Sequence, residues 1–337
     1  MNQPQYEYLV YKIDKKPNCC WDFDLVKRNI SFLDGIDAEY FFYLSDVFER
    51  DLNGENKQKA SVAIRNTYHH ALETFMTLMS AGLQAPGCVY AWIDNARTND
   101  VRSIIKQINT KSRDLFNQWR LSEISWTTIS DKMHFVTETD KPLVEDQKEI
   151  ASNFATFWTE CAYSFLEDEV QKEYNAIKHG FRSKAGGYQF SYKGKSKTTN
   201  AEMHIDLGSS EYGTSFIVVE KIELPKQKPN VNYRPKSMYL NWNPILLLSS
   251  IRLLSLSIQN LANYLKISNG SDPNTSKYFV PETEELFNES KAAIKKSTMA
   301  KFDFEFCMQG FNGLTIKQVN QLLDRLKKEN MKHNMEK

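Results

Sequence analysis

The chain has 337 residues, of which 41% are hydrophobic and 25% are charged. These fractions are typical of a folded globular protein and exclude an intrinsically disordered chain. Lys and Arg total 43 against 42 Asp and Glu, so no global charge draws the protein to nucleic acid or to a membrane. Any site for a polyanion must therefore be local. The length predicts one large core with an appendage, or two unequal domains.

The cysteines and the apolar segments indicate a reduced, aqueous compartment. The five cysteines are odd in number and scattered, and they form no CxxC pair of the zinc or redox type. The N-terminal residues lack the basic start and apolar run of a signal peptide. The longest apolar stretch, from Pro244 to Ile258, carries Arg252 and is shorter than the roughly 20 residues of a membrane span. We therefore expect a cytoplasmic protein in which this stretch is a buried helix.

The first half of the chain is predicted to be mainly helical. The β-prone residues 6–13 predict a strand. From Ser31 to about Gly82 apolar residues recur at helical spacing, and the polar residues 53–56 divide this region into a helical hairpin. Three shorter helices are expected next, at 98–109, 111–120 and 126–135.

One long helix is expected from about Val144 to Lys178, with Gly180 as its stop. Alternating apolar residues then predict three short strands, around 188–192, 203–207 and 216–224. Residues 225–237 have the Pro and Lys content of an extended linker. The remaining elements are predicted as helices at 243–266, 281–297 and 314–330, with residues 302–306 alternating like one more strand.

These patterns predict a mainly α-helical bundle with a small inserted antiparallel β-sheet and a helical C-terminal extension. The expected parts are an N-terminal extension with a strand at 1–30, a helical bundle at 31–185, an inserted sheet at 186–224, a linker at 225–240, and a closing bundle helix with the C-terminal extension at 241–337.

The segment 174–180, Tyr-Asn-Ala-Ile-Lys-His-Gly, is the first candidate for chemistry. Asn175 and His179 are one helical turn apart, and His179 follows Cys161 by close to five turns, so both are expected to continue the face that includes Cys161. Histidine can act as a general acid or base near neutral pH, and an asparagine or tyrosine partner can fix the orientation of its ring. The alternative is a structural histidine that caps the negative end of the helix dipole.

A local basic sequence surrounds this histidine. From Tyr174 to Ala201 there is no acidic residue, and the basic ones are Lys178, Arg182, Lys184, Lys193, Lys195 and Lys197. Such a patch suits phosphate binding, although a solvated hairpin turn explains the last three lysines equally well. Tyr188 and Tyr192 lie among them and are candidates to stack on bases, but aromatic residues in short strands more often pack within a sheet.

The segment 174–180 resembles the terminal motif of HEPN domains, commonly written Arg-Asn-x-x-x-His-Gly. Asn175, His179 and Gly180 are in register, and Tyr174 stands at the arginine position. The resemblance implies a helical bundle that binds RNA or cleaves it without a metal, in a bacterial stress or antiphage defence setting. In catalytic members the histidine assists attack by the ribose 2′-hydroxyl and the arginine stabilises phosphate charge. Catalysis here therefore requires Lys178 or Arg182 to supply the cation.

A second Arg-x4-His sequence lies at residues 65–70. Arg65 and His69 are one turn apart on a helix, whereas His70 is rotated by about 140° from Arg65. HEPN catalysis usually pairs two motifs across a dimer, and the resemblance therefore implies a composite site of Arg65 and His69 or His70 beside His179. The alternative is a polar helix flank in which Arg65 or His69 pairs with Glu73.

No P-loop, HExxH, GxSxG or convergent metal-ligand set is present in the sequence, so neither a metal nor a cofactor is expected. The leading function is an RNA-binding or RNA-cleaving protein whose partners are RNA and another protein or a second copy of the chain, with no membrane. The alternative is a non-catalytic helical interaction module with a structural His179. A cationic groove containing His179, Lys178 and Arg182 favours RNA, and burial of His179 favours the module.

Overall fold

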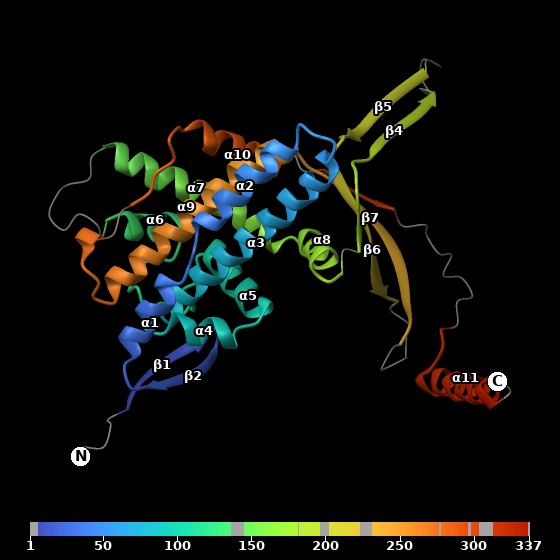
Figure 1. Cartoon of the computed structure of the whole chain (residues 1–337), viewed down its shortest axis with the longest axis horizontal. Helices are drawn as coiled ribbons and strands as arrows, with labels where there is room; N and C mark the ends of the chain where they lie inside the picture. Colours follow the sequence, from blue (N-terminus) through green and yellow to red (C-terminus); the bar gives the residue numbers. More distant parts are fainter. Residues whose placement is uncertain are drawn as a thin grey trace.

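The chain folds into a helical body from which a β-structure and a last helix extend (Figure 1). The computed structural model describes residues 6–135, 145–180, 182–195, 202–222, 231–275, 278–295, 298–302 and 313–335. The predicted class is confirmed: the protein is mainly helical, with a small antiparallel sheet inserted between helices of the bundle.

The helical body contains α1 (Leu25–Asp34), α2 (Glu39–Asp51), α3 (Lys57–Gln84), α4 (Val89–Asn95), α5 (Thr98–Asn109), α6 (Trp126–Phe135), α7 (Glu145–Leu166), α8 (Asp168–Lys178), α9 (Pro244–Ser268) and α10 (Glu285–Lys295), with a 3-10 turn at Pro273–Thr275. Helices α3 and α9 pack side by side at its centre. By length and composition α9 is apolar enough to cross a membrane, but 78% of its most apolar window is buried inside the body. It is the buried helix that the sequence predicts.

The predicted long helix from Val144 to Lys178 is wrong, because the chain breaks between α7 and α8 at Glu167. The Glu167 backbone is extended, with φ −68° and ψ 126°. Arg102 of α5 donates hydrogen bonds to the carbonyls of Phe165 (2.8 Å) and Leu166 (2.7 Å) and pairs with Asp168 (2.7 Å). A side chain from another helix therefore satisfies the carbonyls at the end of α7.

The predicted helix at 111–120 is also wrong, since these residues form turns. Lys111 and Arg120 have positive φ values of 51° and 56°, which a helix does not allow. Two hydrogen bonds tie the segment to the end of α3: the Trp119 Nε1–H donates to the Gly82 carbonyl (2.7 Å) and the Gln118 N–H donates to the Leu83 carbonyl (2.8 Å). Tertiary bonds thus replace the local helical ones.

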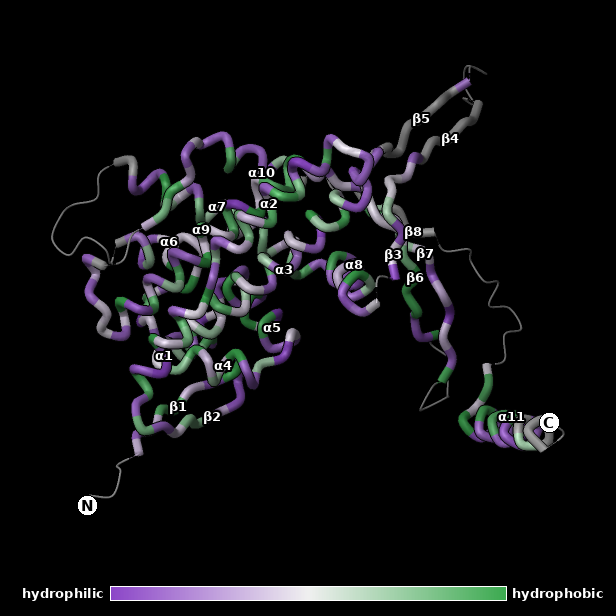
Figure 2. The backbone as a smooth tube through the Cα atoms, viewed as in Figure 1, coloured by the Kyte–Doolittle hydropathy of each residue, from purple (hydrophilic) through white to green (hydrophobic). Residues whose placement is uncertain are grey.

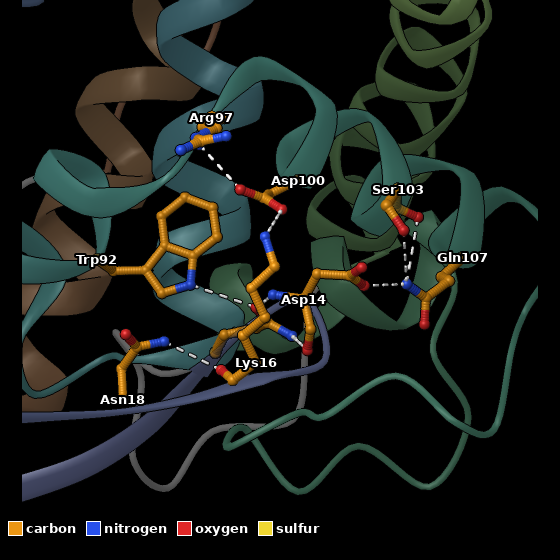
Figure 3. Close-up of polar contacts among 9 residues, drawn as sticks. Asp14, Lys16, Asn18, Trp92, Arg97, Asp100, Ser103 and Gln107 are labelled. Atoms are coloured by element: carbon orange, nitrogen blue, oxygen red, sulfur yellow. Dashed lines mark hydrogen bonds and ion pairs between the residues drawn. The ribbon is translucent and has the colours of Figure 1, made fainter. Parts of the chain in front are cut away.

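The predicted N-terminal strand is confirmed as β1 (Glu7–Ile13), and it pairs with β2 (Lys16–Asp22), which the sequence analysis did not predict. Side-chain hydrogen bonds fix the hairpin turn to the body (Figure 3), among them Trp92 to the Lys12 carbonyl (2.9 Å), Gln107 to Asp14 (2.8 Å) and Lys16 to Asp100 (3.1 Å).

The inserted β-structure comprises two antiparallel sheets. The larger has the strand order β3 (Ser183–Ala185), β6 (Gly213–Lys221), β7 (Tyr233–Asn241), β8 (Thr298–Phe302). The smaller is a hairpin of β4 (Gln189–Lys195) and β5 (Glu202–Ser209), which projects away from the helical body (Figure 1). The three predicted strands are therefore confirmed as β4, β5 and β6.

Two predicted ranges need correction at their ends. The linker expected at 225–237 is wrong from Tyr233 on, because β7 begins there and pairs along its length with β6. Residues 225–230 lie outside the described part of the chain. The last strand, expected at 302–306, overlaps β8 (Thr298–Phe302) only at Phe302, and residues 303–306 lie outside the described part.

The buried face of the larger sheet packs against α3 and α8, the helices that carry the two sequence motifs. Strand β6 lies against α3 and α8. Thr214 and Phe216 of β6 and Met238 and Leu240 of β7 are buried, as is Trp242, which follows β7 directly. Arg65 and His69 of one motif and Tyr174 of the other are thus buried where the sheet meets these helices.

Candidate functional site

The centre of the site is Glu173 of α8, whose side chain has no exposed surface. Its Oε2 atom accepts hydrogen bonds from Nε (2.9 Å) and Nη2 (2.7 Å) of Arg65 and from Nε2 of His69 (3.2 Å). Its Oε1 atom accepts from Nε1 of Trp242 (3.1 Å) and from the Thr214 hydroxyl. One carboxylate therefore joins α3, α8 and the sheet.

The charges in this network are fixed by their surroundings. Burial alone would raise the pKa of the Glu173 carboxyl, but Arg65 and the hydrogen bond from His69 outweigh it and hold that pKa well below its usual range. Burial and the nearby Arg65 lower the pKa of His69. Glu173 is therefore ionised and His69 neutral at neutral pH, and His69 must donate from its Nε2–H because an ionised carboxylate has no proton to give.

A second layer lies between this network and solvent. The Tyr174 hydroxyl (3.0 Å) and the Lys178 ammonium (3.2 Å) both donate to Oε2 of Glu73. The Tyr174 ring stacks on His69 with centroids 5.1 Å apart, and the Lys178 ammonium lies 5.1 Å from the centre of the same ring. Tyr174, at the arginine position of the motif, therefore covers the buried His69 ring.

His179 is exposed at the C-cap of α8, and its N–H donates to the Asn175 carbonyl (3.0 Å). Because the chain breaks at Glu167, Asn175 and His179 do not continue the helix that carries Cys161, and that expectation is wrong. The Asn175 amide oxygen accepts from Gln171 (3.3 Å) rather than orienting the His179 ring. The histidine is thus presented to solvent at a helix end.

Basic side chains continue from His179 into β3. Lys178, Arg182 and Lys184 are all exposed. Arg182 closes the turn after α8, because its N–H donates to the Ala176 carbonyl (2.7 Å). Gly180 has φ +99°, a conformation that favours glycine, and it lets the chain leave the helix at this point. We call Lys178, His179, Arg182 and Lys184 the α8 end surface.

The aromatic and hairpin residues predicted to contact RNA are only partly described. Tyr188 is half-buried and packs edge-on against Tyr239, with centroids 5.9 Å apart, so its ring belongs to the sheet. The side chains of Tyr192, Lys193 and Lys195 lie outside the described part of the structure, and so does Lys197.

In the described part of the chain no hydrogen bond, ion pair or ring contact joins His179 to Arg65, His69 or His70, so the composite site expected from the second motif stays a prediction. Arg65 and His69 are buried and bonded to Glu173 rather than to Glu73. His70 is exposed and contacts Phe41 edge-on at 5.3 Å. Partial desolvation lowers the pKa of His70, and the charges of Glu73 and Lys178 act on it in opposite directions. His70 is thus the residue of the second motif that lies at the surface near Lys178.

Three residues of the buried network were missed by the sequence analysis: Glu173, Thr214 and Trp242. A signal for Glu173 existed, since it lies three residues after Val170 and four before Ile177, within the apolar stripe of α8. A carboxylate in such a stripe requires a buried partner. Thr214 and Trp242 carried no comparable signal, because their role depends on how the sheet packs.

The arrangement offers two exposed histidines, His70 and His179, and the exposed cations Lys178 and Arg182. In the interior, the ion pair between Arg65 and Glu173 joins α3 to α8. Among the described residues no group of three or more His, Cys, Asp or Glu side chains is placed to hold a metal ion. No protein-family model, curated protein or solved structure matches the chain.

Proposed function

We propose that the α8 end surface binds RNA and that His179 supports metal-independent cleavage of the bound strand. The observation that carries the proposal is that His179 is exposed between Lys178, which also pairs with Glu73, and the exposed Arg182 and Lys184. The sequence from Tyr174 to Ala201 contains no acidic residue. Phosphate binding draws on such local clusters of Lys and Arg even when the net charge of the protein is close to zero.

In the proposed reaction the ribose 2′-oxygen attacks the adjacent phosphorus atom and its proton passes to His179. The bond from phosphorus to the 5′-oxygen breaks, and the 5′-oxygen takes a proton from solvent. The products are a 2′,3′-cyclic phosphate and a 5′-hydroxyl. Lys178 and Arg182 balance the charge that develops on the phosphoryl oxygens. Arg65 is a positioning residue, because its ion pair with Glu173 fixes α8, the helix that ends at His179.

The test is incubation of the purified protein with mixed RNA in EDTA. We expect cleavage, and we expect His179→Ala to lower its rate by about a hundredfold or more, the usual contribution of general acid or base catalysis. Lys27→Ala is the matched control, since Lys27 is exposed on α1, remote from α8. Cleavage that survives both EDTA and His179→Ala unchanged would overturn the proposed reaction.

RNA binding is measured separately from cleavage, with a single-stranded RNA that carries 2′-O-methyl groups and therefore has no attacking hydroxyl. We expect Arg182→Ala and Lys184→Ala each to weaken binding, and Lys27→Ala to leave it unchanged. Equal affinities for all three variants would contradict RNA binding at the α8 end surface.

A second candidate function is a non-catalytic interaction module in which His179 only caps α8. The observation in its favour is that Arg65 and His69, which the resemblance assigns to catalysis, are enclosed in an internal ion pair. This candidate predicts no cleavage and no loss of RNA binding in the Arg182→Ala and Lys184→Ala variants, so the same two measurements separate the functions.

A further inference from the structure

A groove with acidic and aromatic walls opens between α2, α9 and the segment that leads into α10. Its volume is about 1130 Å³. Its lining includes the aromatic residues Tyr40, Tyr43 and Phe279 and the acidic residues Asp37, Glu39 and Glu282. Tyr43 is 64% exposed and Tyr40 is 46% exposed. Large aromatic side chains with this much exposed surface on the wall of a groove are typical of a protein-binding site.

The charge of the groove is negative because Arg252, which lines it, is already neutralised by acidic neighbours. Arg252 bonds to Asp46 (2.9 Å) and to Glu49 (2.6 Å). Within the described part of the chain, neither Glu39 nor Glu282 forms an ion pair. A partner with an apolar face and flanking cations would therefore match both the walls and the charge of the groove.

The helix α11 has an apolar face and flanking cations, and it packs on little of the part of the chain that the structure describes. The described side chains from Leu314 to Glu329 are exposed, with the exception of a half-buried Val319. Figure 1 shows α11 beyond β6 and β7, away from α2, α9 and α10. Hydrophobic and hydrophilic residues alternate along it (Figure 2). Leu323 is 57% exposed and Leu326 is 55% exposed.

Local bonds define where α11 begins but do not bury it. Asn232 exchanges two hydrogen bonds of 2.9 Å with the backbone of Leu314. Thr315 and Gln318 form a reciprocal pair at the helix start, since the Thr315 N–H donates to the Gln318 side chain (2.9 Å) and the Gln318 N–H donates to the Thr315 hydroxyl (3.3 Å). Most of the stability of a helix in a protein comes from packing of its apolar face, so the exposed apolar stripe of α11 calls for a partner.

The charge of α11 is opposite to that of the groove. Its sequence holds five Lys or Arg residues against two Asp or Glu residues. At 100° per residue, Val319, Leu322, Leu323 and Leu326 form one stripe, and Arg325 and Lys327 lie on its two sides. Pairing α11 with another α11 would bring two positive helices together over fewer than three heptads, which is unfavourable.

We propose that α11 of one copy of the chain docks in the acidic groove of a second copy, and that the second copy returns the same contact. A reciprocal exchange of this kind gives a closed dimer with twofold symmetry. The partner is a second copy because, in this structure, α11 is anchored at Asn232, on the far side of the β-strands from its own groove.

The test measures the mass of the full-length protein by sedimentation at several concentrations. We expect a dimer that weakens as salt is raised, because the contact pairs opposite charges. Leu323→Asp with Leu326→Asp on the helix, and Glu39→Lys with Glu282→Lys in the groove, should each weaken the dimer by about tenfold or more. Glu55→Lys, an exposed change outside the groove, is the control and should leave the dimer intact.

Two further measurements separate this contact from the alternatives. Arg325→Glu with Lys327→Glu should weaken the dimer, and combining it with Glu39→Lys and Glu282→Lys should restore it. A wild-type protein that stays monomeric at tens of micromolar overturns the proposal, whether or not α11 docks on its own chain. A dimer that resists the groove changes but not the helix changes also overturns it, and indicates pairing between α11 helices.

Discussion

Glu173 carries a full negative charge although its side chain has no exposed surface. The ion pair with Arg65 stabilises this buried charge. Removing one member of a buried ion pair leaves the other charge without compensation, which costs about 3–5 kcal/mol. We expect Glu173→Gln to lower the free energy of unfolding in urea by this amount, because the amide keeps the shape but not the charge.

The matched control is Glu73→Gln, four residues from His69 on α3. The Glu73 side chain is 25% exposed and its ion pair with Lys178 is partly hydrated. Such pairs contribute about 0–1 kcal/mol. Equal losses for the two variants would show that the buried network around Glu173 does not hold α3, α8 and the sheet together.

His134 is a second buried histidine, and it makes the stability of the fold depend on pH. Its Nδ1 lies 2.6 Å from the Ser130 carbonyl and therefore carries the proton, so Nε2 accepts from the Tyr278 hydroxyl. Desolvation lowers the pKa of His134 to about 4. Because the unfolded chain keeps a histidine pKa near 6.5, it binds more protons than the folded chain between these values.

We therefore expect the free energy of unfolding to fall by about 3 kcal/mol from this group as pH drops from about 6.5 to about 4. The lowered pKa of His69 acts in the same direction. His134→Gln should make the dependence shallower, as measured by urea unfolding at pH 7.5 and pH 4.5. An identical difference between the two pH values in the variant would contradict the assignment.

The same residues show how far a sequence can predict a site. Arg65, His69 and His70 stood out because basic residues and histidines at one-turn spacing form a recognisable pattern. Their true partner did not stand out, since Glu173 lies 108 positions from Arg65 and the pairing depends on how α3 meets α8. Glu73, the partner in the alternative interpretation of this motif, is close in sequence, but it accepts hydrogen bonds from Tyr174 and Lys178 instead.

At the scale of elements, apolar residues at helical spacing predicted helices such as α9, and local capping bonds show where such a helix begins. The N-cap of α9 is an example: the Asn243 side chain accepts from the N–H groups of Ile245 (2.9 Å) and Leu246 (3.4 Å), and Pro244 follows in the first turn. The break at Glu167 had no such signal, because Arg102 of another helix supplies the hydrogen bonds that allow it.

The N-cap gives a prediction at this scale. Asn243→Ala should lower the free energy of unfolding by about 1 kcal/mol, because two N–H groups at the start of α9 lose their acceptor. Asn243→Asp keeps the acceptor and should stay within a few tenths of a kcal/mol of the parent. Both values come from urea unfolding near neutral pH. A similar loss in the two variants would mean that the cap does not determine the stability of α9.

At the scale of the whole molecule, the class of fold followed from the change of apolar period after residue 180, but the division into two sheets did not. An alternating apolar pattern predicts that a segment is a strand, but it does not predict which other strand that segment pairs with. Strand β6 pairs with β3 and β7 rather than with β5, which leaves β4 and β5 as a separate hairpin. That pairing is set by the buried contacts of Phe216 and Met238, which lie opposite each other in the register.

The separate hairpin makes it possible to remove basic residues without disturbing the core. Replacing residues 190–208 with a short Gly-Ser linker deletes Lys193, Lys195 and Lys197, and it leaves the larger sheet and the network around Glu173 in place. We expect an unchanged free energy of unfolding and weaker binding of the uncleavable single-stranded RNA.

The size of the effect follows from counterion release. Each phosphate contact contributes about 0.7 to the slope of log affinity against log salt for a single strand, so losing three should lower the slope by about 2. Lys184→Ala, which removes one exposed cation of the α8 end surface next to the hairpin, should lower it by about 0.7. If the slope changes for Lys184→Ala but not for the deletion, RNA is bound at the end of α8 and the hairpin lysines are solvated turn residues.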